Sequence, residues 1–315
     1  MASGSIIGQP VPQVTAREKV LGEAKYVADI SLPQMLHAKV LRSPHAHARI
    51  VRVDVERARA VRGVKAVLTG ADVPAHPWGP IVKEHRILAV EKVRFAGEEV
   101  AAVVAVDEET ALDALELIRV EYAELPAVFD PEEALRPGAP EIHAGTGNLA
   151  REIKIERGDV EAGFREADVV HEETYQTSQQ YQAYMEPMGT VAAVDGSGRL
   201  TVWAPTQSIY FTRELVAHAI GIPASQVRVI QTHVGGGFGG KLTEDANSPL
   251  CAWLAQKCGR PVRLINTRLD DFQAARSRMP ARIRLKMGVK KNGEIVAKEA
   301  EIFGDNGAYS GLAPE

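Results

Sequence analysis

The sequence predicts an α+β chain of two domains. A continuous apolar strand at residues 100–106 precedes a helix at 108–118, and a strand at 227–230 precedes a glycine-rich loop and a helix at 246–258. A hairpin is expected around Asn292 and Gly293, because Asn-Gly between two strand-like runs is the strongest short turn signal. Strands, helices and hairpins mixed without a regular repeat are typical of this fold class.

The first predicted domain covers residues 1–130. Asp107 caps its helix, acidic residues fill the first turn, and apolar residues recur at helical spacing. The apolar positions are Ala111, Leu112, Leu115 and Ile118. Residues 131–149 are rich in proline and glycine and are predicted to form a linker, so the second domain covers 150–315.

The second domain contains further local signals. The run Asp-Gly-Ser-Gly at 195–198 predicts a turn between strands at 191–194 and 200–203. A helix over 214–220 is expected to end at Gly221. Strands at 283–289 and 295–302 flank the Asn-Gly turn, and Arg282, Arg284 and Lys286 alternate with apolar residues there. That alternation predicts a half-buried strand with a solvated cationic face.

Composition excludes several classes of protein. The chain has 315 residues, 45% of them hydrophobic, and a net charge of −4, which suits two domains with full cores. No apolar run approaches the roughly 20 residues of a membrane helix, and no secretion signal is visible. Nucleic-acid binding has little support, because aromatic residues are 5% of the total and do not interleave with basic ones.

The two cysteines, Cys251 and Cys258, lie seven residues apart on one predicted helix. A disulfide at that spacing within a straight helix is sterically impossible, so both are expected to be reduced. A cytoplasmic location is expected for that reason. Two thiols are also too few for this chain to hold iron–sulfur clusters.

The glycine loop is the most informative stretch of the chain. Residues 234–241 read Val-Gly-Gly-Gly-Phe-Gly-Gly-Lys, and five glycines in six positions allow the backbone to approach a ligand closely. A phosphate-binding loop would need Ser or Thr where Leu242 stands. A dinucleotide-binding unit would need an acidic residue after the next strand, which is followed by Asn266 and Thr267. A ligand-free tight turn needs only one or two glycines.

A resemblance supplies a third interpretation. Six blocks in order are similar to the molybdenum hydroxylases, the xanthine dehydrogenase and aldehyde oxidase family. The blocks are Leu-Arg-Ser-Pro-His-Ala-His-Ala at 41–48, Val-Arg-Phe-Ala-Gly-Glu-Glu-Val at 93–100 with Val-Glu-Tyr at 120–122, Met-Glu-Pro at 185–187, Trp-Ala-Pro-Thr-Gln at 203–207, the glycine loop, and Arg-Met-Pro at 278–280. The resemblance implies a hammerhead-like α/β domain followed by the first molybdopterin-binding α+β domain.

The same resemblance implies the cofactor and its contacts. In that family a pterin dithiolene holds molybdenum, and Gln207 occupies the position of the glutamine that hydrogen-bonds an oxygen on the metal. Gly236, Gly237, Phe238 and Gly239 occupy the loop that places backbone amides beside the pterin. The cytosine dinucleotide form of molybdopterin is expected. The reaction implied is hydroxylation of a carbon centre with oxygen from water, and electrons leave through iron–sulfur centres.

Two departures from the family affect the function. Gln182 stands where the family usually carries His, and Leu242 stands where purine-oxidising members carry Glu. Because an apolar side chain cannot hydrogen-bond a purine edge, the expected substrate is an aldehyde, an aromatic heterocycle or an acyl thioester. The alternative is a non-catalytic structural or cofactor-binding subunit. A third possibility is a nucleotide-hydrolysing protein that uses the loop and Lys241.

The resemblance ends before the family's C-terminal half, which supplies the glutamate base near the metal. No catalytic residue is therefore assigned in this chain. Expected partners are a second molybdopterin-binding polypeptide or the missing half, an iron–sulfur subunit and a subunit carrying FAD.

Four other polar residues have expected roles. His45 and His47 would face the same way on a strand, but no third ligand is near in sequence, so polar or surface roles are favoured over a metal site. Glu186 could be a catalytic base, and a hydrogen-bonding role is favoured. Lys241 is expected either to neutralise a phosphate or to point into solvent.

Overall fold

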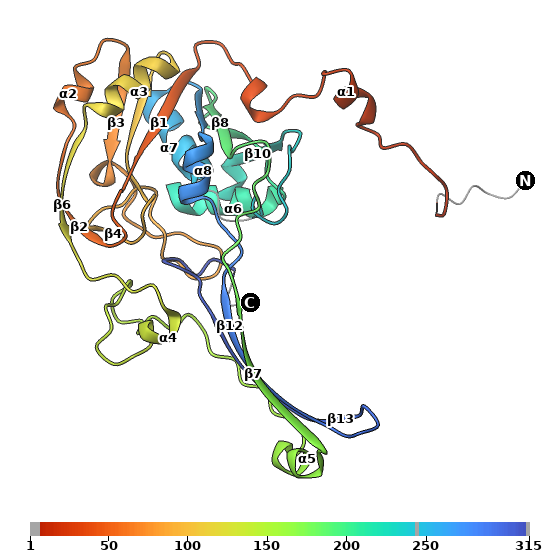
Figure 1. The fold of residues 1–315 in the computed structure, drawn as a ribbon. Coiled ribbons are helices and arrows are strands. Elements are labelled where there is room, and N and C mark those ends of the chain that lie inside the picture. Colours follow the sequence, from red (N-terminus) through yellow and green to blue (C-terminus); the bar gives the residue numbers. More distant parts are fainter. Residues whose placement is uncertain (1–6, 243–245, 313–315) are drawn as a thin grey trace, which may run out of the picture.

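The computed structural model describes residues 7–242 and 246–312. It consists of a body built on a seven-stranded sheet and an arm that projects from it (Figure 1). The N-terminal segment with α1 (Ala16–Val20) extends away from the body on the side opposite α2 (Glu56–Arg59).

The seven-stranded sheet joins the two halves of the sequence. Its order is β10-β9-β8-β11-β1-β5-β3. The strands are β1 (Leu36–Arg42), β3 (Val64–Thr69), β5 (Glu99–Ala105), β8 (Gly189–Val194), β9 (Leu200–Ala204), β10 (Val227–Gln231) and β11 (Val262–Ile265). The join is a parallel pairing of β1 with β11, in which Leu36 lies opposite Val262. The boundary between the two expected domains stays a prediction, because one sheet runs across it.

Helices cover this sheet where the sequence predicts them. α3 (Glu108–Glu116) packs on β1 and β5, and Asp107 caps it by accepting a hydrogen bond from the amide of Thr110 at 2.7 Å. Of its four expected apolar positions, Ala111 and Ile118 are buried, Leu115 is partly buried and Leu112 remains 41% exposed. Leu112 lies outside the buried stripe of this short helix, which runs through Ala111 and Ala114.

Two longer helices cover the other half of the sheet. α6 (Ile209–Ile220) begins five residues before the predicted start, and α7 (Asn247–Cys258) packs on β8 and β11. Gly221 and Gly259 end them in the left-handed region, at φ of 74° and 60°. Both cysteines on α7 are free thiols, with Cys251 buried and Cys258 partly buried.

A small sheet and several short helices complete the body. The sheet has the order β4-β2-β6 and holds β2 (Ala48–Asp54), β4 (Lys92–Val93) and β6 (Arg119–Glu124). A further helix of the body is α8 (Arg268–Ala274), and the 3₁₀ turns are η1 (Val27–Asp29), η2 (Gly70–Asp72) and η3 (Ala224–Gln226). Within the described parts of the chain, no helix is long and apolar enough to cross a bilayer.

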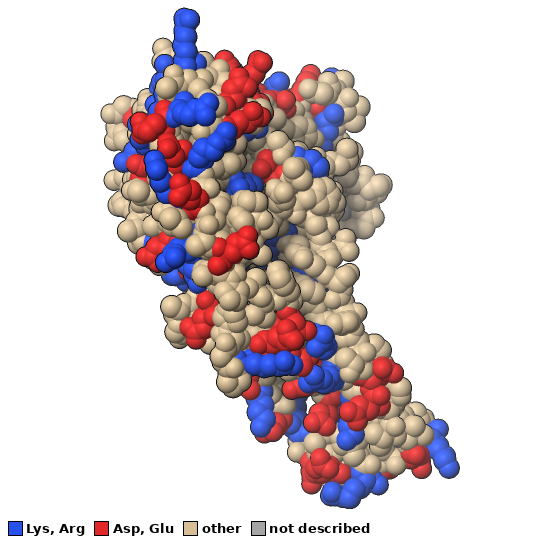
Figure 2. Space-filling model, turned by 60° about the vertical axis from the view of Figure 1, so that its left-hand side comes forward, with Lys and Arg blue, Asp and Glu red and all other residues tan. Residues whose placement is uncertain are grey.

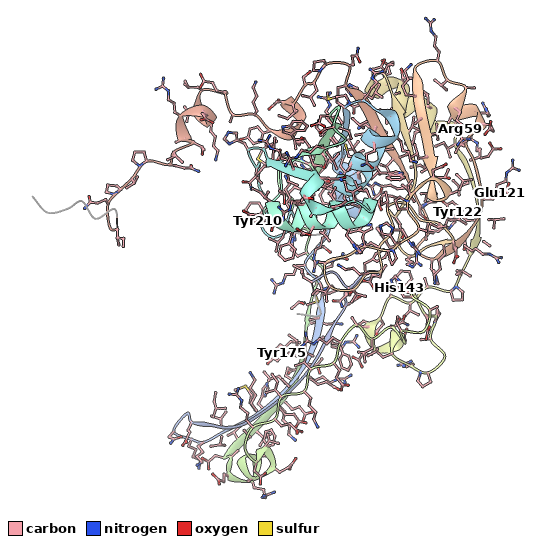
Figure 3. The ribbon with its side chains drawn as sticks, turned by 180° about the vertical axis from the view of Figure 1, so that it is seen from behind. Arg59, Glu121, Tyr122, His143, Tyr175 and Tyr210 are labelled. Carbon is pink, nitrogen blue, oxygen red and sulfur yellow. The ribbon has the colours of Figure 1, made fainter. Side chains whose placement is uncertain are left out.

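The arm is a three-stranded antiparallel sheet in the order β13-β12-β7. It holds β7 (Val169–Thr177), β12 (Ala281–Val289) and β13 (Ile295–Gly304), with α5 (Val160–Glu166) at its tip (Figure 1). The predicted Asn-Gly hairpin joins β12 to β13, and the other predicted hairpin joins β8 to β9. Figure 3 shows Tyr175 on the arm and His143 between the arm and the body.

The alternation predicted that the basic face of β12 is solvated. In the structure, two arginines of this face also form ion pairs with acidic side chains. Arg282 contacts Asp130 at 3.1 Å and Glu132 at 2.6 Å, and Arg284 contacts Glu132 and Glu301. These acids come from α4 (Pro131–Ala134) with its cap, and from β13. Figure 2 shows the result, since basic and acidic residues are interspersed over the body and arm on that face.

Candidate functional site

The glycine loop links the edge strand β10 to α7. Its centre is a tight turn in which the amide of Gly240 donates to the carbonyl of Gly237 at 2.7 Å. The two residues between them, Phe238 and Gly239, have φ of 52° and 88°. A turn with positive φ at both central positions favours glycine, so Phe238 occupies a backbone conformation that L residues rarely adopt. Such strained positions cluster at functional sites.

The five glycines are required for different reasons. A Cβ at Gly235 would lie 2.5 Å from the Cβ of Glu186, and one at Gly237 would lie 2.6 Å from Oε1 of Gln207. Gly240 is closed in a similar way by Tyr184 and Gln182, while Gly236 has both a positive φ and a near neighbour. Gly239 differs, because a Cβ there would meet no atom within 4 Å. The loop is therefore packed on its inner side and open at Gly239.

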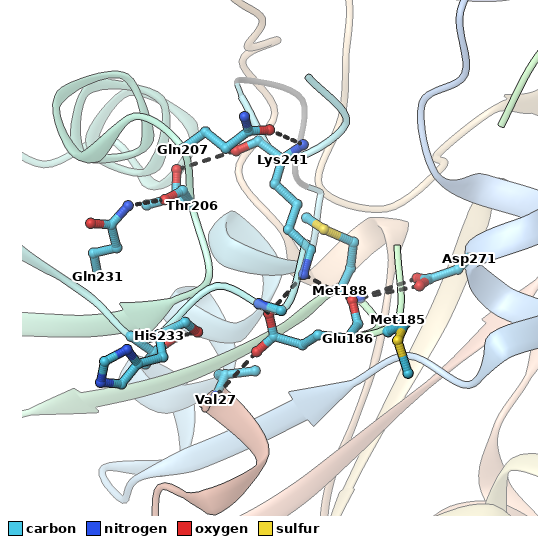
Figure 4. A network of polar contacts seen from close by, with 12 residues as sticks. Val27, Met185, Glu186, Met188, Thr206, Gln207, Gln231, His233, Lys241 and Asp271 are labelled. Carbon is cyan, nitrogen blue, oxygen red and sulfur yellow. Dashed lines mark hydrogen bonds and ion pairs between the residues drawn. The ribbon is translucent and has the colours of Figure 1, made fainter. Parts of the chain in front are cut away.

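Gln207 lies at this open side and is itself exposed. Its Oε1 accepts hydrogen bonds from the amides of Gly239 at 3.0 Å and Lys241 at 3.2 Å. Because the oxygen is engaged by two donors, the NH₂ group of the side chain faces away from the loop (Figure 4). The arrangement presents a fixed hydrogen-bond donor beside a stretch of backbone that carries no side chain.

The backbone of Gln207 is fixed as well. Its amide donates to the carbonyl of Lys241 at 2.8 Å. The preceding residue, Thr206, is buried; its hydroxyl lies 2.8 Å from that of Thr212, and its carbonyl accepts from the side chain of Gln231 at 2.5 Å. These contacts fix the end of β9 where it turns into α6, and so fix the position of Gln207.

Lys241 behaves in neither of the two ways expected from the sequence. It is only 2% exposed, and its Nζ donates to the carbonyl and to Oε2 of Glu186, each at 2.8 Å (Figure 4). The same Nζ lies 4.6 Å from the centre of the Tyr184 ring. Because the ammonium points inward, the nucleotide-hydrolysing interpretation lacks the lysine that would contact phosphate.

Glu186 makes structural hydrogen bonds. Besides Lys241, its carboxylate accepts from the amide of Gly235 at 2.8 Å and from the amide of Val27 at 3.5 Å. Sequence reasoning favoured such a role but missed both its partners and the contribution of the N-terminal segment. There His233, just before the loop, contacts Glu18 at 3.1 Å and donates its amide to the carbonyl of Lys25. No periodicity or motif could have signalled contacts over such sequence distances.

Other residues near the loop differ in exposure. Phe238 is 75% exposed, Met185 is 90% exposed and Leu242 is partly buried. Gln182, which replaces the family's His, has its Oε1 buried with no hydrogen-bond partner among the described residues. Arg278 forms a reciprocal pair of backbone hydrogen bonds with Gln180, at 2.8 and 3.2 Å.

The two histidine rings contact different groups. The ring of His47 is buried against the carbonyl of Pro126 at 2.7 Å, while the ring of His45 packs at a tilt against Tyr122 and lies 3.5 Å from Glu124. In residues 7–242 and 246–312, no three His, Cys, Asp or Glu side chains gather as metal ligands. Both histidines therefore make polar contacts with neighbouring protein groups.

A surface cavity lies at the opposite edge of the sheet, along β3, and is lined by Arg59, Lys65 and Lys257 among others. Figure 3 shows Arg59 and Tyr210 on opposite sides of the body. The glycine loop follows the other edge strand, β10, so this cavity is not part of the loop site.

A second buried polar cluster lies where β5 begins. Glu98 accepts hydrogen bonds from the hydroxyl of Tyr309 and from the amide of Arg94, and His85 stacks on the Tyr309 ring at 4.0 Å between centroids. Burial raises the pKa of Glu98 to about 7 and lowers the pKa of His85 to about 3. His143 binds the carbonyl of Ala308 in the same cluster at 2.7 Å.

Comparisons with known proteins extend these observations. Residues 142–315 match the family described as the molybdopterin cofactor-binding domain, and residues 21–126 match the a/b hammerhead domain of aldehyde oxidase and xanthine dehydrogenase. A probable xanthine dehydrogenase subunit of Bacillus subtilis is 42% identical over 95% of this chain and 40% of its own length. The nicotinate dehydrogenase large molybdopterin subunit of Eubacterium barkeri is 39% identical over 98% of this chain and 72% of its own length.

Solved structures of molybdenum-enzyme relatives have the same fold. The aldehyde oxidoreductase from Desulfovibrio desulfuricans superposes with a TM-score of 0.90 at 26% identity, over 96% of this chain and 35% of that one. The chain thus spans about 40% of the Bacillus subtilis relative and about a third of this solved chain. Several of the relatives are named as subunits or large chains of dehydrogenases.

Proposed function

This chain belongs to the xanthine dehydrogenase and aldehyde oxidase family of molybdopterin-binding proteins, and on that premise we propose that it is the molybdopterin-binding part of a molybdenum hydroxylase. The substrate class proposed is an aldehyde, an aromatic heterocycle or an acyl thioester. The bound cofactor supplies the two-electron chemistry that hydroxylates a carbon centre with oxygen from water.

The observation that carries the proposal is the outward NH₂ group of Gln207 beside the open face at Gly239. A cofactor rich in oxygen atoms requires donors that do not move and a backbone it can approach without side chains. The residues present fit that requirement. In the proposal Gln207 donates to an oxygen of the cofactor, and residues 236–239 form the backbone surface against which the pterin rests.

The remaining side chains near the loop would act on substrate and water. Phe238, exposed on the turn, gives the reaction site an apolar wall. Leu242 offers no hydrogen bond to a purine edge, and the Eubacterium barkeri relative is named for an aromatic acid, so an aromatic heterocycle is the favoured class.

Other polypeptide segments are part of the proposal. Iron–sulfur clusters and FAD would reside on partner subunits, because two free cysteines cannot hold clusters. A second molybdopterin-binding region, in a separate chain or in a longer form of this one, would complete the site and supply the base. The cytosine dinucleotide form of the cofactor and a cytoplasmic location are proposed with it.

A specific observation favours the alternative of a non-catalytic subunit. Gln182 replaces a histidine of the family and leaves a buried oxygen without a partner among the described residues. Such a group costs stability unless a ligand or another segment supplies a donor. A protein that keeps the fold but has lost the chemistry would tolerate this change.

One experiment separates the two functions. The protein is isolated with its native partners, and molybdenum, pterin and dye-linked oxidation of aldehydes and N-heterocycles are measured. The catalytic proposal expects about one molybdenum per chain and turnover of one of these classes. A complex that contains the chain but neither metal nor pterin would contradict it, and a loaded but inactive complex would support the alternative.

A further inference from the structure

One carboxylate holds both ends of the glycine loop. Oε2 of Glu186 accepts from the amide of Gly235, where the loop begins, and from Nζ of Lys241, where it ends, each at 2.8 Å. The main chain of Glu186 repeats both contacts, since its amide donates to the carbonyl of Gly235 at 3.1 Å and its carbonyl accepts from Nζ of Lys241 at 2.8 Å. Residue 186 thereby fixes the span of the loop.

The pair is buried in a way that makes it hard to separate. The Lys241 side chain is 0% exposed and that of Glu186 is 10% exposed. Because water cannot replace either partner, breaking this pair is costly. The Tyr184 ring against the ammonium adds a favourable cation–π contact. The loop is therefore fixed by charge and not only by its turn geometry.

Lys241 transmits this constraint to Gln207. Its backbone amide donates to Oε1 of Gln207 at 3.2 Å, and its carbonyl accepts from the backbone amide of Gln207 at 2.8 Å. If the Lys241 end moves, the acceptor and donor that orient the Gln207 side chain move with it. Figure 4 shows the continuous path from Glu186 through Lys241 to Gln207.

We propose that Glu186 is a positioning residue for the glycine loop and that it acts through Lys241 to hold the Gln207 amide with its NH₂ group outward. Glu186 does not serve as a base, because both carboxylate oxygens accept hydrogen bonds from groups on the inner side of the loop. The proposal rests on the proposed function only for the identity of the loop's ligand.

The test is amide hydrogen exchange, read residue by residue in the full chain. Glu186→Gln removes the carboxylate charge that faces the buried ammonium, so exchange at Gly239 and Lys241 should accelerate by roughly ten- to a hundredfold, the equivalent of losing a charge-assisted hydrogen bond. Glu99→Gln is the matched control, since Glu99 is a similarly buried partner of Arg42 at 2.6 Å with no contact to the loop. In that variant the loop amides should exchange as in the wild type.

A double variant keeps the test decisive if Glu186→Gln fails to fold. Glu186→Gln with Lys241→Met removes both charges. The glutamine keeps an acceptor for the Gly235 amide, whereas the contact between residues 186 and 241 at the other end of the loop is lost. Exchange should then rise at Gly239 and residue 241 but not at Gly235. Unchanged loop exchange in a folded variant, or an equal rise in the Glu99→Gln control, would overturn the proposal. Because this readout needs no cofactor, absence of molybdenum from the wild-type complex would contradict the proposed function alone.

Discussion

Two buried polar clusters in this protein hold a carboxylate in opposite ways. At the glycine loop, Glu186 meets a full cation, because Nζ of Lys241 lies 2.8 Å away. At the start of β5, Glu98 meets a phenol and a backbone amide, and the nearest guanidinium nitrogen of Arg94 stands 3.9 Å away. The first cluster is fixed by opposite charges, whereas in the second, burial favours the protonated form of the carboxyl group.

The difference follows from what each cluster joins. In the proposed function the glycine loop is a site that must not move, so a charge pair that is costly to break suits it. The Glu98 cluster joins the first part of the chain to the segment after β13, since Tyr309 and Ser310 dock there and Ser310 donates to Glu84 at 2.7 Å. His143 adds a contact from the segment between the two halves. The contribution of this Glu98 cluster to stability is therefore expected to depend on pH.

Breaking the charge pair should have the largest effect on the molecule. Lys241→Met leaves Glu186 buried without its cation and should lower the free energy of unfolding by about 3–5 kcal/mol, measured by urea denaturation. Lys290→Met is the control, because its contact with Glu166 at 3.4 Å is largely exposed and should contribute about 0–1 kcal/mol. If both variants lose the same small amount, the loop is not held by charge.

The contribution of the Glu98 cluster to the free energy of unfolding should change with pH in a defined direction. The pKa of Glu98 is raised by burial from 4.5 to about 7, so its contribution to stability is present below pH 4.5 and is lost as the pH rises to 7. The difference in unfolding free energy between wild type and Glu98→Gln should change by about 1.4 kcal/mol for each pH unit in that window. Thermal melts at several pH values measure it.

His85 acts in the opposite direction within the same cluster. Burial lowers its pKa from 6.5 to about 3, so its contribution is present above pH 6.5 and is lost as the pH falls to 3. Between pH 4.5 and 6.5 the contributions of Glu98 and His85 to stability change with pH in opposite directions. In Glu98→Gln only the His85 contribution remains, so the loss of stability at low pH should become visible. Glu109→Gln, at an exposed position on α3, should leave the profile unchanged. If the stability of Glu98→Gln changes with pH in parallel with that of the wild type, the pH dependence assigned to the Glu98 cluster is wrong.

The outer end of the loop cluster can be tested without disturbing its inner end. Gln207→Glu keeps an oxygen for the amides of Gly239 and Lys241 but removes the outward donor. The loaded complex should turn over substrate about ten- to a hundredfold more slowly, since a charge-assisted hydrogen bond contributes about 1.5–3 kcal/mol. Turnover is compared at equal molybdenum content, with Gln207→Ala alongside. Wild-type rates in Gln207→Glu would exclude the donor role.

A small effect is expected at Leu242, just beyond the charge pair. The wild-type complex should not oxidise xanthine or hypoxanthine efficiently, and Leu242→Glu should raise that activity by about tenfold, as one hydrogen bond to a purine allows. Leu242→Met, which keeps the volume and adds no strong acceptor, is the control. Efficient purine oxidation by the wild type would remove Leu242 as a determinant of substrate class.

Glycine substitutions distinguish packing from ligand approach. Gly237→Ala should displace Gln207, because its Cβ would lie 2.6 Å from Oε1, whereas Gly239→Ala meets no neighbour and carries only the strain of a positive φ, about 1–2 kcal/mol. Reduced molybdenum loading in folded Gly239→Ala would indicate that a ligand approaches the open face. Full loading in both variants would contradict a cofactor surface there.

Signals carried by neighbouring residues were sufficient for much of the fold. The Asn-Gly hairpin, the Asp107 cap, and the strand, loop and helix around residues 227–258 follow from turn, capping and periodicity preferences that act within a few residues. The loop and Gln207 emerged as candidates from motif resemblance. The prediction for the start of α6 was wrong, because the length of a helix depends on what packs against it.

The sequence by itself determined the local elements, the family and the glycine-rich loop, because each depends on residue types at short and fixed spacing. Only the tertiary structure decided that Lys241 points inward to Glu186, 55 residues away, and that β1 pairs with β11 across the predicted linker. It also decided that Gly237 leaves room for Gln207 while Gly239 stays open. These contacts depend on which segments, distant in sequence, lie side by side in the fold. Local sequence patterns do not predict that.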